Sequence, residues 1–234
     1  MIQPVRVSTL AGDQGLADLP APETPLPLSH LVPGAGPWEV EIGFGKGRYL
    51  LRRCAEDPNR RFLGIEVVNE YQSLFVDRAR SRGLSNWAAL RGEALYLLSA
   101  VLPVGFADAV HVYFPDPWPK SRHQKRRLFD PQTVDLVVGL LRPGARLLFA
   151  TDFLAYGEIV TEILESYPGL RVTRRERVWD EGPRTNYEAK YIVEGRPILR
   201  LEVEREGGAS EGKPAPIHPR GVAGVVAATF RDEE

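Results

Sequence analysis

The fold of this chain is decided by one stretch, Trp38-Glu39-Val40-Glu41-Ile42-Gly43-Phe44-Gly45-Lys46-Gly47. It begins as an apolar run, Trp38 to Phe44, and continues into a helical pattern from about Lys46 to Glu56. Glycines at such a strand-to-helix turn let the backbone approach a ligand, and the helix start offers free N–H groups. A nucleotide-like ligand fits this turn, although the pattern alone is equally typical of an ordinary tight turn. The turn lacks the third glycine of G-x-G-x-x-G, which argues against a dinucleotide pyrophosphate.

The following residues alternate between short apolar runs and helical periodicity, the pattern of a parallel sheet covered by helices. After the first strand and helix, strands are expected at Arg61 to Val67, 87–91, Ala107 to Phe114 and Arg146 to Ala150, and helices at Glu70 to Arg82, Leu95 to Val101, Pro131 to Leu141 and Tyr156 to Ser166. Two β-rich runs, Leu170 to Val178 and Tyr191 to Val203, flank a polar loop from Trp179 to Lys190. Two strands in succession predict a closing antiparallel hairpin.

The ends of the chain differ in composition from this region. Residues 1–37 are rich in proline, which favours loop or extended chain, and we interpret them as an N-terminal extension. Residues 38–205 form the predicted α/β domain. Residues 206–234 combine a linker rich in Gly, Pro and charge with a short apolar tail.

Composition indicates the setting of the protein. Of 234 residues, 43% are hydrophobic and 26% are charged, which is typical of a globular protein. No apolar run approaches the ~20 residues that a membrane-spanning helix needs. The N-terminus lacks the pattern of a secretory signal, and the single cysteine, Cys54, fits a reducing environment, so a cytoplasmic location is expected.

Three acidic residues are expected beside the glycines of the turn, Gly43 and Gly45. Glu66 ends the second strand, where its carboxylate can accept hydrogen bonds from both hydroxyls of a ribose at the carboxyl edge of the sheet. Glu41 lies in the first strand and Glu93 follows the third. A row of carboxylates suits a cationic ligand better than a pyrophosphate, so S-adenosylmethionine is favoured over NAD.

A rigid segment follows the strand that ends at Phe114. Two prolines fix the backbone on either side of Asp116, and Trp118 follows. A tryptophan beside a cluster of cations is typical of base stacking and phosphate contact, so this segment predicts RNA binding despite a net charge of −1. The alternative is a solvated helix start. The run behind Trp118 contains Lys120, Arg122, His123, Gln124, Lys125, Arg126 and Arg127.

Two later sites complete the set of candidates. Asp152 follows the strand that ends at Ala150 and is expected at the same edge of the sheet. Thr185-Asn186-Tyr187-Glu188 lies in the polar loop, where the Glu188 carboxylate could accept hydrogen bonds from N1–H and the N2 amine of a guanine and exclude adenine. Arg184 and Lys190 could add phosphate contacts. Taken alone, these residues favour an ordinary surface loop.

In combination, the motifs resemble those of the bacterial tRNA (guanine-N7-)-methyltransferases. The resemblance covers about Trp38 to Arg205. It rests, in chain order, on Glu41 to Gly47, Gly64 to Val67, Phe114 to Arg127, Thr151-Asp152 and Thr185 to Glu188. It implies a Rossmann-like class I S-adenosylmethionine-dependent methyltransferase, α/β, with a mostly parallel seven-stranded sheet and a C-terminal antiparallel hairpin. It further implies methyl transfer to N7 of the variable-loop guanine, nucleotide 46, of tRNA.

The resemblance also implies roles for individual residues. The cofactor site would be formed by Glu41, Gly43, Gly45, Glu66, Glu93 and Asp116. The substrate would meet Lys120, Asp152, Thr185, Asn186, Tyr187 and Glu188, and Arg122 to Arg127 would touch RNA. The expected partner is tRNA, no metal is expected, and the oligomeric state stays open. The family usually has Lys at the position of Asn186 and Arg at that of Lys190, so the charge of this loop is weaker here.

Guanine N7 carries an in-plane lone pair and no proton, so its attack on a sulfonium methyl group needs no general base. Asp116 is therefore expected to act as the catalytic residue by orienting the reactants and stabilising the guanine as it becomes cationic. Three alternatives remain: a related methyltransferase of another RNA or a small molecule, an NAD-dependent oxidoreductase, and a tRNA-binding scaffold without catalysis. The missing third glycine argues against the oxidoreductase, and the four acids argue against the scaffold.

Overall fold

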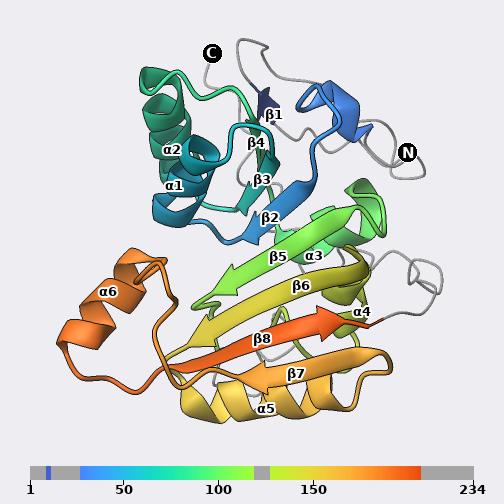
Figure 1. The fold of residues 1–234 in the computed structure, drawn as a ribbon, viewed down its shortest axis with the longest axis vertical. Coiled ribbons are helices and arrows are strands. Elements are labelled where there is room, and N and C mark those ends of the chain that lie inside the picture. Colours follow the sequence, from blue (N-terminus) through green and yellow to red (C-terminus); the bar gives the residue numbers. More distant parts are fainter. Residues whose placement is uncertain (1–8, 12–26, 119–126, 207–234) are drawn as a thin grey trace.

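The structure, a computed structural model, describes residues 9–11, 27–118 and 127–206. An eight-stranded sheet runs through the molecule and helices cover it (Figure 1). The strands are β1 (Thr9–Ala11), β2 (Trp38–Ile42), β3 (Arg61–Glu66), β4 (Trp87–Arg91), β5 (Ala107–Tyr113), β6 (Leu141–Thr151), β7 (Leu170–Arg174) and β8 (Leu199–Arg205). The helices are η1 (Leu28–His30), α1 (Arg48–Glu56), α2 (Asn69–Ser81), α3 (Ala94–Tyr96), η2 (Leu97–Val101), α4 (Val134–Val138), α5 (Leu154–Glu165) and α6 (Asn186–Val193).

The strand order is β1-β4-β3-β2-β5-β6-β8-β7. Strands β2 to β6 pair in parallel, whereas β8 is antiparallel to both β6 and β7. The chain moves outward from β2 to β4 and then returns to β5 on the other side of β2. This reversal places a topological switch point between β2 and β5, where ligands of open α/β sheets bind at the carboxyl ends of the strands. The predicted fold class is confirmed, with β1 added as an antiparallel edge strand.

The two faces of the sheet are covered differently. One face packs against α4, α5 and η2 in the largest core cluster, which includes Val40, Val110 and Phe149. On the other face α1 and α2 cover β3 and β4 through Leu50, Phe75 and their neighbours. Over β5 and β6 that second face is covered by the loop that carries Trp179. None of the described helices is long and apolar enough to cross a bilayer.

The predicted boundaries fail in three places, the first of which is β7, which ends at Arg174 and not at Val178. The helix expected from Pro131 to Leu141 spans only Val134–Val138, and β6 already begins at Leu141. The region between β7 and β8 contains α6, so the expected loop to Lys190 and the strand from Tyr191 are wrong. The predicted antiparallel pairing of the last two strands is confirmed. The division at residues 37 and 205 stays a prediction, since most of both end segments lies outside the described residues.

Candidate functional site

The glycine turn after β2 leaves open space beside its backbone. Gly43 and Gly45 have positive φ angles of 76° and 53°, and a Cβ on either would meet no atom within 4 Å among the described residues. Glu66 shapes this turn from the neighbouring strand. Its Oε2 accepts the N–H of Gly45 at 2.8 Å, while Oε1 accepts those of Val67 and Val68 at 2.8 and 2.9 Å. The carboxylate therefore fixes the conformation of the turn.

Glu41 is a buried carboxyl group at the same edge, with 3% of its surface exposed. Burial raises its pKa to about 8; the N–H of Leu50 opposes that rise, and the charge of Glu66 adds to it. Its Oε2 has no hydrogen-bond partner among the residues that the structure describes. Burying a polar atom without a partner is costly, so this position suits a ligand that donates hydrogen bonds or carries positive charge.

Glu93 follows β4 and caps α3, where its Oε2 accepts the N–H of Tyr96 at 2.9 Å. Glu41, Glu66 and Glu93 thus come from or directly follow three neighbouring parallel strands, β2, β3 and β4. The sequence predicted this convergence of the three acids at one edge of the sheet, and the structure brings the strands together in that order.

The chain leaves β5 in a strained conformation. Phe114 and Trp118 have φ angles of 54° and 41°, in the left-handed region that non-glycine residues rarely adopt. The side chain of Asp116 between them is exposed. Such strain persists only where surrounding contacts hold it, and it is common at functional sites.

Arg127 supplies one of these contacts. Its Nε donates to the carbonyl of Pro117 at 2.8 Å and its Nη2 to that of Trp118 at 3.4 Å. The guanidinium lies over the ring of Tyr156 and the residue is 8% exposed. In this structure Arg127 stabilises the Asp116 loop and does not face solvent, unlike the RNA contact expected from sequence. The other candidates of the basic run, Lys120, Arg122, His123, Gln124, Lys125 and Arg126, lie outside the described residues.

Helix α6 projects beyond the carboxyl ends of β5 and β6 (Figure 1). Thr185 caps it, since its Oγ1 accepts the N–H of Glu188 at 3.0 Å. Asn186 accepts a hydrogen bond from Arg48 at 3.2 Å, so α1 brings a positive charge beside Asn186. Tyr187 is 55% exposed and its ring centre lies 6.3 Å from that of Phe114.

Glu188 lies where the sequence did not lead us to expect it. It is fully buried, and both carboxylate oxygens are engaged: Oε1 accepts Nε of Arg200 at 2.7 Å and Oε2 the backbone N–H of Arg184 at 2.8 Å. A guanine could pair with Glu188 only after these bonds break. Asp152 is half-buried and forms an ion pair of 3.6 Å with Arg196.

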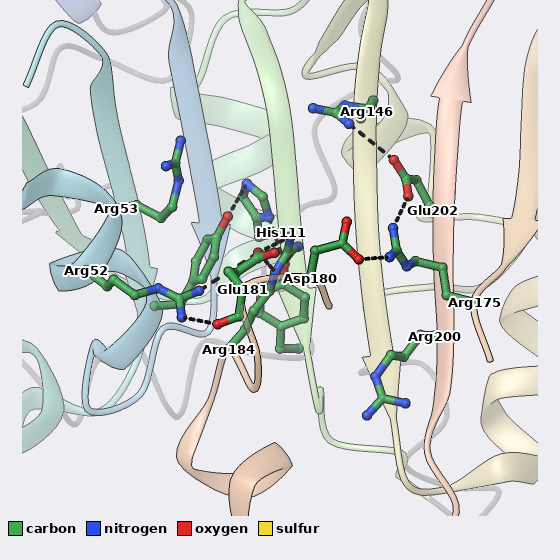
Figure 2. Close-up of polar contacts among 12 residues, drawn as sticks. Arg52, Arg53, His111, Arg146, Arg175, Asp180, Glu181, Arg184, Arg200 and Glu202 are labelled. Atoms are coloured by element: carbon green, nitrogen blue, oxygen red, sulfur yellow. Dashed lines mark hydrogen bonds and ion pairs between the residues drawn. The ribbon is translucent and has the colours of Figure 1, made fainter. Parts of the chain in front are cut away.

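A polar cavity of about 390 Å³ lies over β5 and β6, between α1 and the loop that carries Trp179. Figure 2 shows its charged side chains, with Arg184 and Glu181 toward α1 and with Arg175, Asp180 and Glu202 toward β8. Arg184 was expected to reach phosphates, yet only 11% of its side chain is exposed. The sequence carries no signal for this burial, because two of the rings around Arg184, those of Tyr49 and Tyr113, come from distant segments.

The fold is similar to that of solved RNA methyltransferases. The crystal structure of the 16S rRNA methyltransferase KamB matches with a TM-score of 0.60, covering 86% of this chain and 100% of that chain at 14% identity. A variant of the 16S rRNA (adenine(1408)-N(1))-methyltransferase of Catenulisporales acidiphilia, solved with its cosubstrate S-adenosylmethionine, matches with a TM-score of 0.55, covering 86% of this chain and 97% of that chain at 18% identity. These likenesses show that the chain has the Rossmann-like fold of class I methyltransferases.

Sequence comparison narrows this class to one family. A family model described as "Putative methyltransferase" matches residues 35–201. The tRNA (guanine-N(7)-)-methyltransferase of Nitrosococcus oceani is 37% identical over 166 residues, 71% of this chain and 70% of that protein. The enzyme of the same description from Alkalilimnicola ehrlichii is 36% identical over 190 residues, 80% of each chain. The chain belongs to the family of tRNA (guanine-N(7)-)-methyltransferases, which confirms the resemblance found in its motifs.

Proposed function

We propose that this protein transfers a methyl group from S-adenosylmethionine to N7 of a guanine in tRNA, at nucleotide 46 of the variable loop. The observation that carries the proposal is the convergence of Glu41, Glu66 and Glu93 with the Asp116 loop at the switch point of a methyltransferase fold. Since tRNA is the substrate, we also propose a cytoplasmic location.

The residues at this edge fit the cofactor. The space beside Gly43 and Gly45 admits a ligand backbone or ring, and the Glu66 carboxylate is fixed by three N–H groups in a position to accept ribose hydroxyls. Oε2 of Glu41, which has no partner within the described part of the chain, suits the cationic amino group of the methionine part. Glu93 would complete the pocket beyond β4.

The cofactor supplies its methyl group on a sulfonium sulfur, which is a good leaving group. The protein must then align guanine N7 with that methyl group, which supplies the entropic part of the rate. We assign this role to the Asp116 loop, whose rigid exit from β5 fixes the carboxylate in space. The Asp116 carboxylate also stabilises the positive charge that develops on the guanine ring. No proton leaves N7 in this step.

On the substrate side, we propose that Asp152, Thr185, Asn186 and Tyr187 approach the target nucleotide from β6 and α6. Glu188 would act indirectly, by holding the start of α6 through Arg184 and Arg200. Lys120 and the run from Arg122 to Arg126 would contact the tRNA backbone, and Arg127 would support the Asp116 loop.

In the decisive experiment, the protein is incubated with methyl-labelled S-adenosylmethionine and unmodified tRNA. The labelled nucleoside and its position in the tRNA are then identified. We expect 7-methylguanosine at nucleotide 46, and no label in a tRNA that carries adenine there. An otherwise identical tRNA with guanine replaced outside the variable loop is the matched control. Label in another nucleoside, or at another guanine, would refute the assignment and favour a methyltransferase of different specificity.

A further inference from the structure

A cluster of aromatic rings at the projecting helix α6 (Figure 1) is centred on Tyr191, a residue outside the motifs described above. The ring centre of Tyr191 lies 5.5 Å from that of Phe114 and 6.1 Å from that of Tyr187. The guanidinium carbon of Arg196, from the segment before β8, lies 4.6 Å from the same ring centre. Ring–ring and cation–π contacts of this kind favour particular relative orientations of the side chains. Tyr191 thus joins α6 to the exit of β5 and to the approach to β8.

Arg196 extends this cluster to the end of β6. Its Nη1 lies 3.6 Å from Oδ2 of Asp152, and its Nε lies 2.7 Å from Oε2 of Glu194 at the end of α6. The separation of 3.6 Å exceeds the length of a hydrogen bond, so the Asp152 oxygen keeps its capacity to accept one from a ligand. The ion pair therefore holds the Asp152 carboxylate near α6 without occupying it.

Phe114 connects the same cluster to the Asp116 loop. The chain leaves β5 at Phe114 with a φ angle of 54°, and strain of this kind persists only where surrounding contacts hold it. The backbone N–H of Phe114 donates to the carbonyl of Ala150 at 2.7 Å, and its ring contacts Tyr187 and Tyr191. Asp116 follows two residues later. The rings of α6 therefore support the direction in which the chain enters the Asp116 loop.

We propose that Tyr191 and Arg196 are positioning residues for methyl transfer, which fix the Asp152 carboxylate relative to the Asp116 loop. The series of contacts runs from Phe114 through Tyr191 and Arg196 to Asp152. The inference rests on the proposed function, in which Asp152 approaches the target guanine and the Asp116 loop aligns it with the methyl group. Misplacement of reacting groups by about 1 Å can slow a reaction about a hundredfold.

The test compares Tyr191→Ala, Tyr191→Phe and Arg196→Gln with two matched controls. Val193→Ala changes a residue that lies two positions further along α6 and is 88% exposed. Arg171→Gln removes an exposed arginine on β7 that, like Arg196, pairs with two acids. The rate of methyl transfer is measured in single turnovers, with protein and S-adenosylmethionine in excess over tRNA. Dissociation constants for tRNA and S-adenosylhomocysteine, and Tm, are measured separately.

Tyr191→Ala and Arg196→Gln should lower the single-turnover rate by roughly ten- to a hundredfold, because the reactants are misaligned. Both dissociation constants and Tm should stay close to those of the wild type, since both side chains are partly exposed. Tyr191→Phe should retain the wild-type rate, because it keeps the ring. In the Asp152→Asn background, Arg196→Gln should cause no further loss, since Arg196 acts through that carboxylate. Both controls should match the wild type.

A weaker affinity for tRNA at an unchanged single-turnover rate would overturn the inference and make Tyr191 and Arg196 contacts to RNA only. Additive losses from Arg196→Gln and Asp152→Asn, or an equal loss in Val193→Ala, would contradict it as well. Should Tyr191→Ala not fold, Arg196→Gln and its combination with Asp152→Asn decide the question. A wild type that transfers no methyl group to tRNA would refute the proposed function, which is a different result from an active wild type with variants of unchanged rate.

Discussion

Replacing Glu188 by glutamine removes one negative charge from a fully buried position without changing the size of the side chain. In the wild type, the Glu188 carboxylate accepts one hydrogen bond from Arg200 and one from the backbone of Arg184. Glutamine keeps one oxygen and turns an amide N–H₂ toward the other donor. One of the two N–H groups loses its acceptor, and the Arg200 guanidinium, 5% exposed, loses its counter-charge.

Removing one partner of a buried ion pair destabilises a protein by about 3–5 kcal/mol. Because glutamine still accepts one hydrogen bond, we expect the lower end, about 3 kcal/mol. In a protein of this size, each kcal/mol shifts Tm by roughly 2–4 °C. The variant should therefore unfold roughly 6–12 °C below the wild type.

Thermal unfolding followed by circular dichroism measures this shift, and steady-state methylation of tRNA at 25 °C separates kcat from KM. Glu158→Gln is the control, since Glu158 forms an exposed ion pair with Arg174 and such pairs contribute little. In the double variant Glu188→Gln/Arg200→Gln, the loss of stability should be smaller than the sum of the losses in the two single variants, because both changes break the same contact.

An unchanged Tm together with a large rise in KM for tRNA would refute this reasoning. It would show that Glu188 faces the target base in the working enzyme, as the family motif implied, and that its pairing with Arg200 is not retained when tRNA binds. A fall in Tm with nearly unchanged KM, in contrast, would confirm a supporting role.

Asp116→Ala should retain the wild-type Tm, because the side chain is exposed, but lose most methyl transfer at saturating substrates; near wild-type kcat would remove Asp116 from its role. In a plot of the logarithm of tRNA affinity against the logarithm of salt concentration, Arg126→Gln should reduce the slope by about 0.9 per lost phosphate contact, the value for duplex DNA. The Tm should be unchanged. Arg127→Gln should instead lower Tm, since two loop carbonyls lose their donor, and leave the slope unchanged; the reverse pattern would exchange the two roles. Burial raises the pKa of the Cys54 thiol, so iodoacetamide at pH 8 should label it only after unfolding in guanidinium, and rapid labelling of the native protein would contradict this.

The sequence predicted the strands from β2 to β6 because their apolar runs are local and bounded by glycine or proline. Helix α6 was missed because Tyr191, Ile192 and Val193 are typical of a strand. The signal for a helix was present, however, as Thr185 and Glu188 have the spacing of a capping box, and the structure uses the Thr185 cap. Ile192 and Val193 are exposed, so their β-branched side chains do not join the core.

The acids of the cofactor edge could be predicted because the carboxyl ends of parallel strands meet at one edge of a sheet. The burial of charged side chains could not. Arg127 is buried by carbonyls and by Tyr156, Glu188 by Arg200, and Arg184 by rings from three elements. Tyr156, Arg200, Tyr49 and Tyr113 all come from other elements, so no local pattern distinguishes a buried arginine from one that contacts RNA.

The segment between β7 and β8 departs from and returns to neighbouring strands, since Arg174 pairs with Leu201. Its two ends are thus held together by the sheet whatever lies between them, and doubling the length of such a loop costs only about 0.6 kcal/mol in closure entropy. Residues 175–198 can therefore vary in length without cutting the sheet, provided that Trp179 keeps its packing against β5 and β6 and Glu188 its pairing with Arg200 on β8.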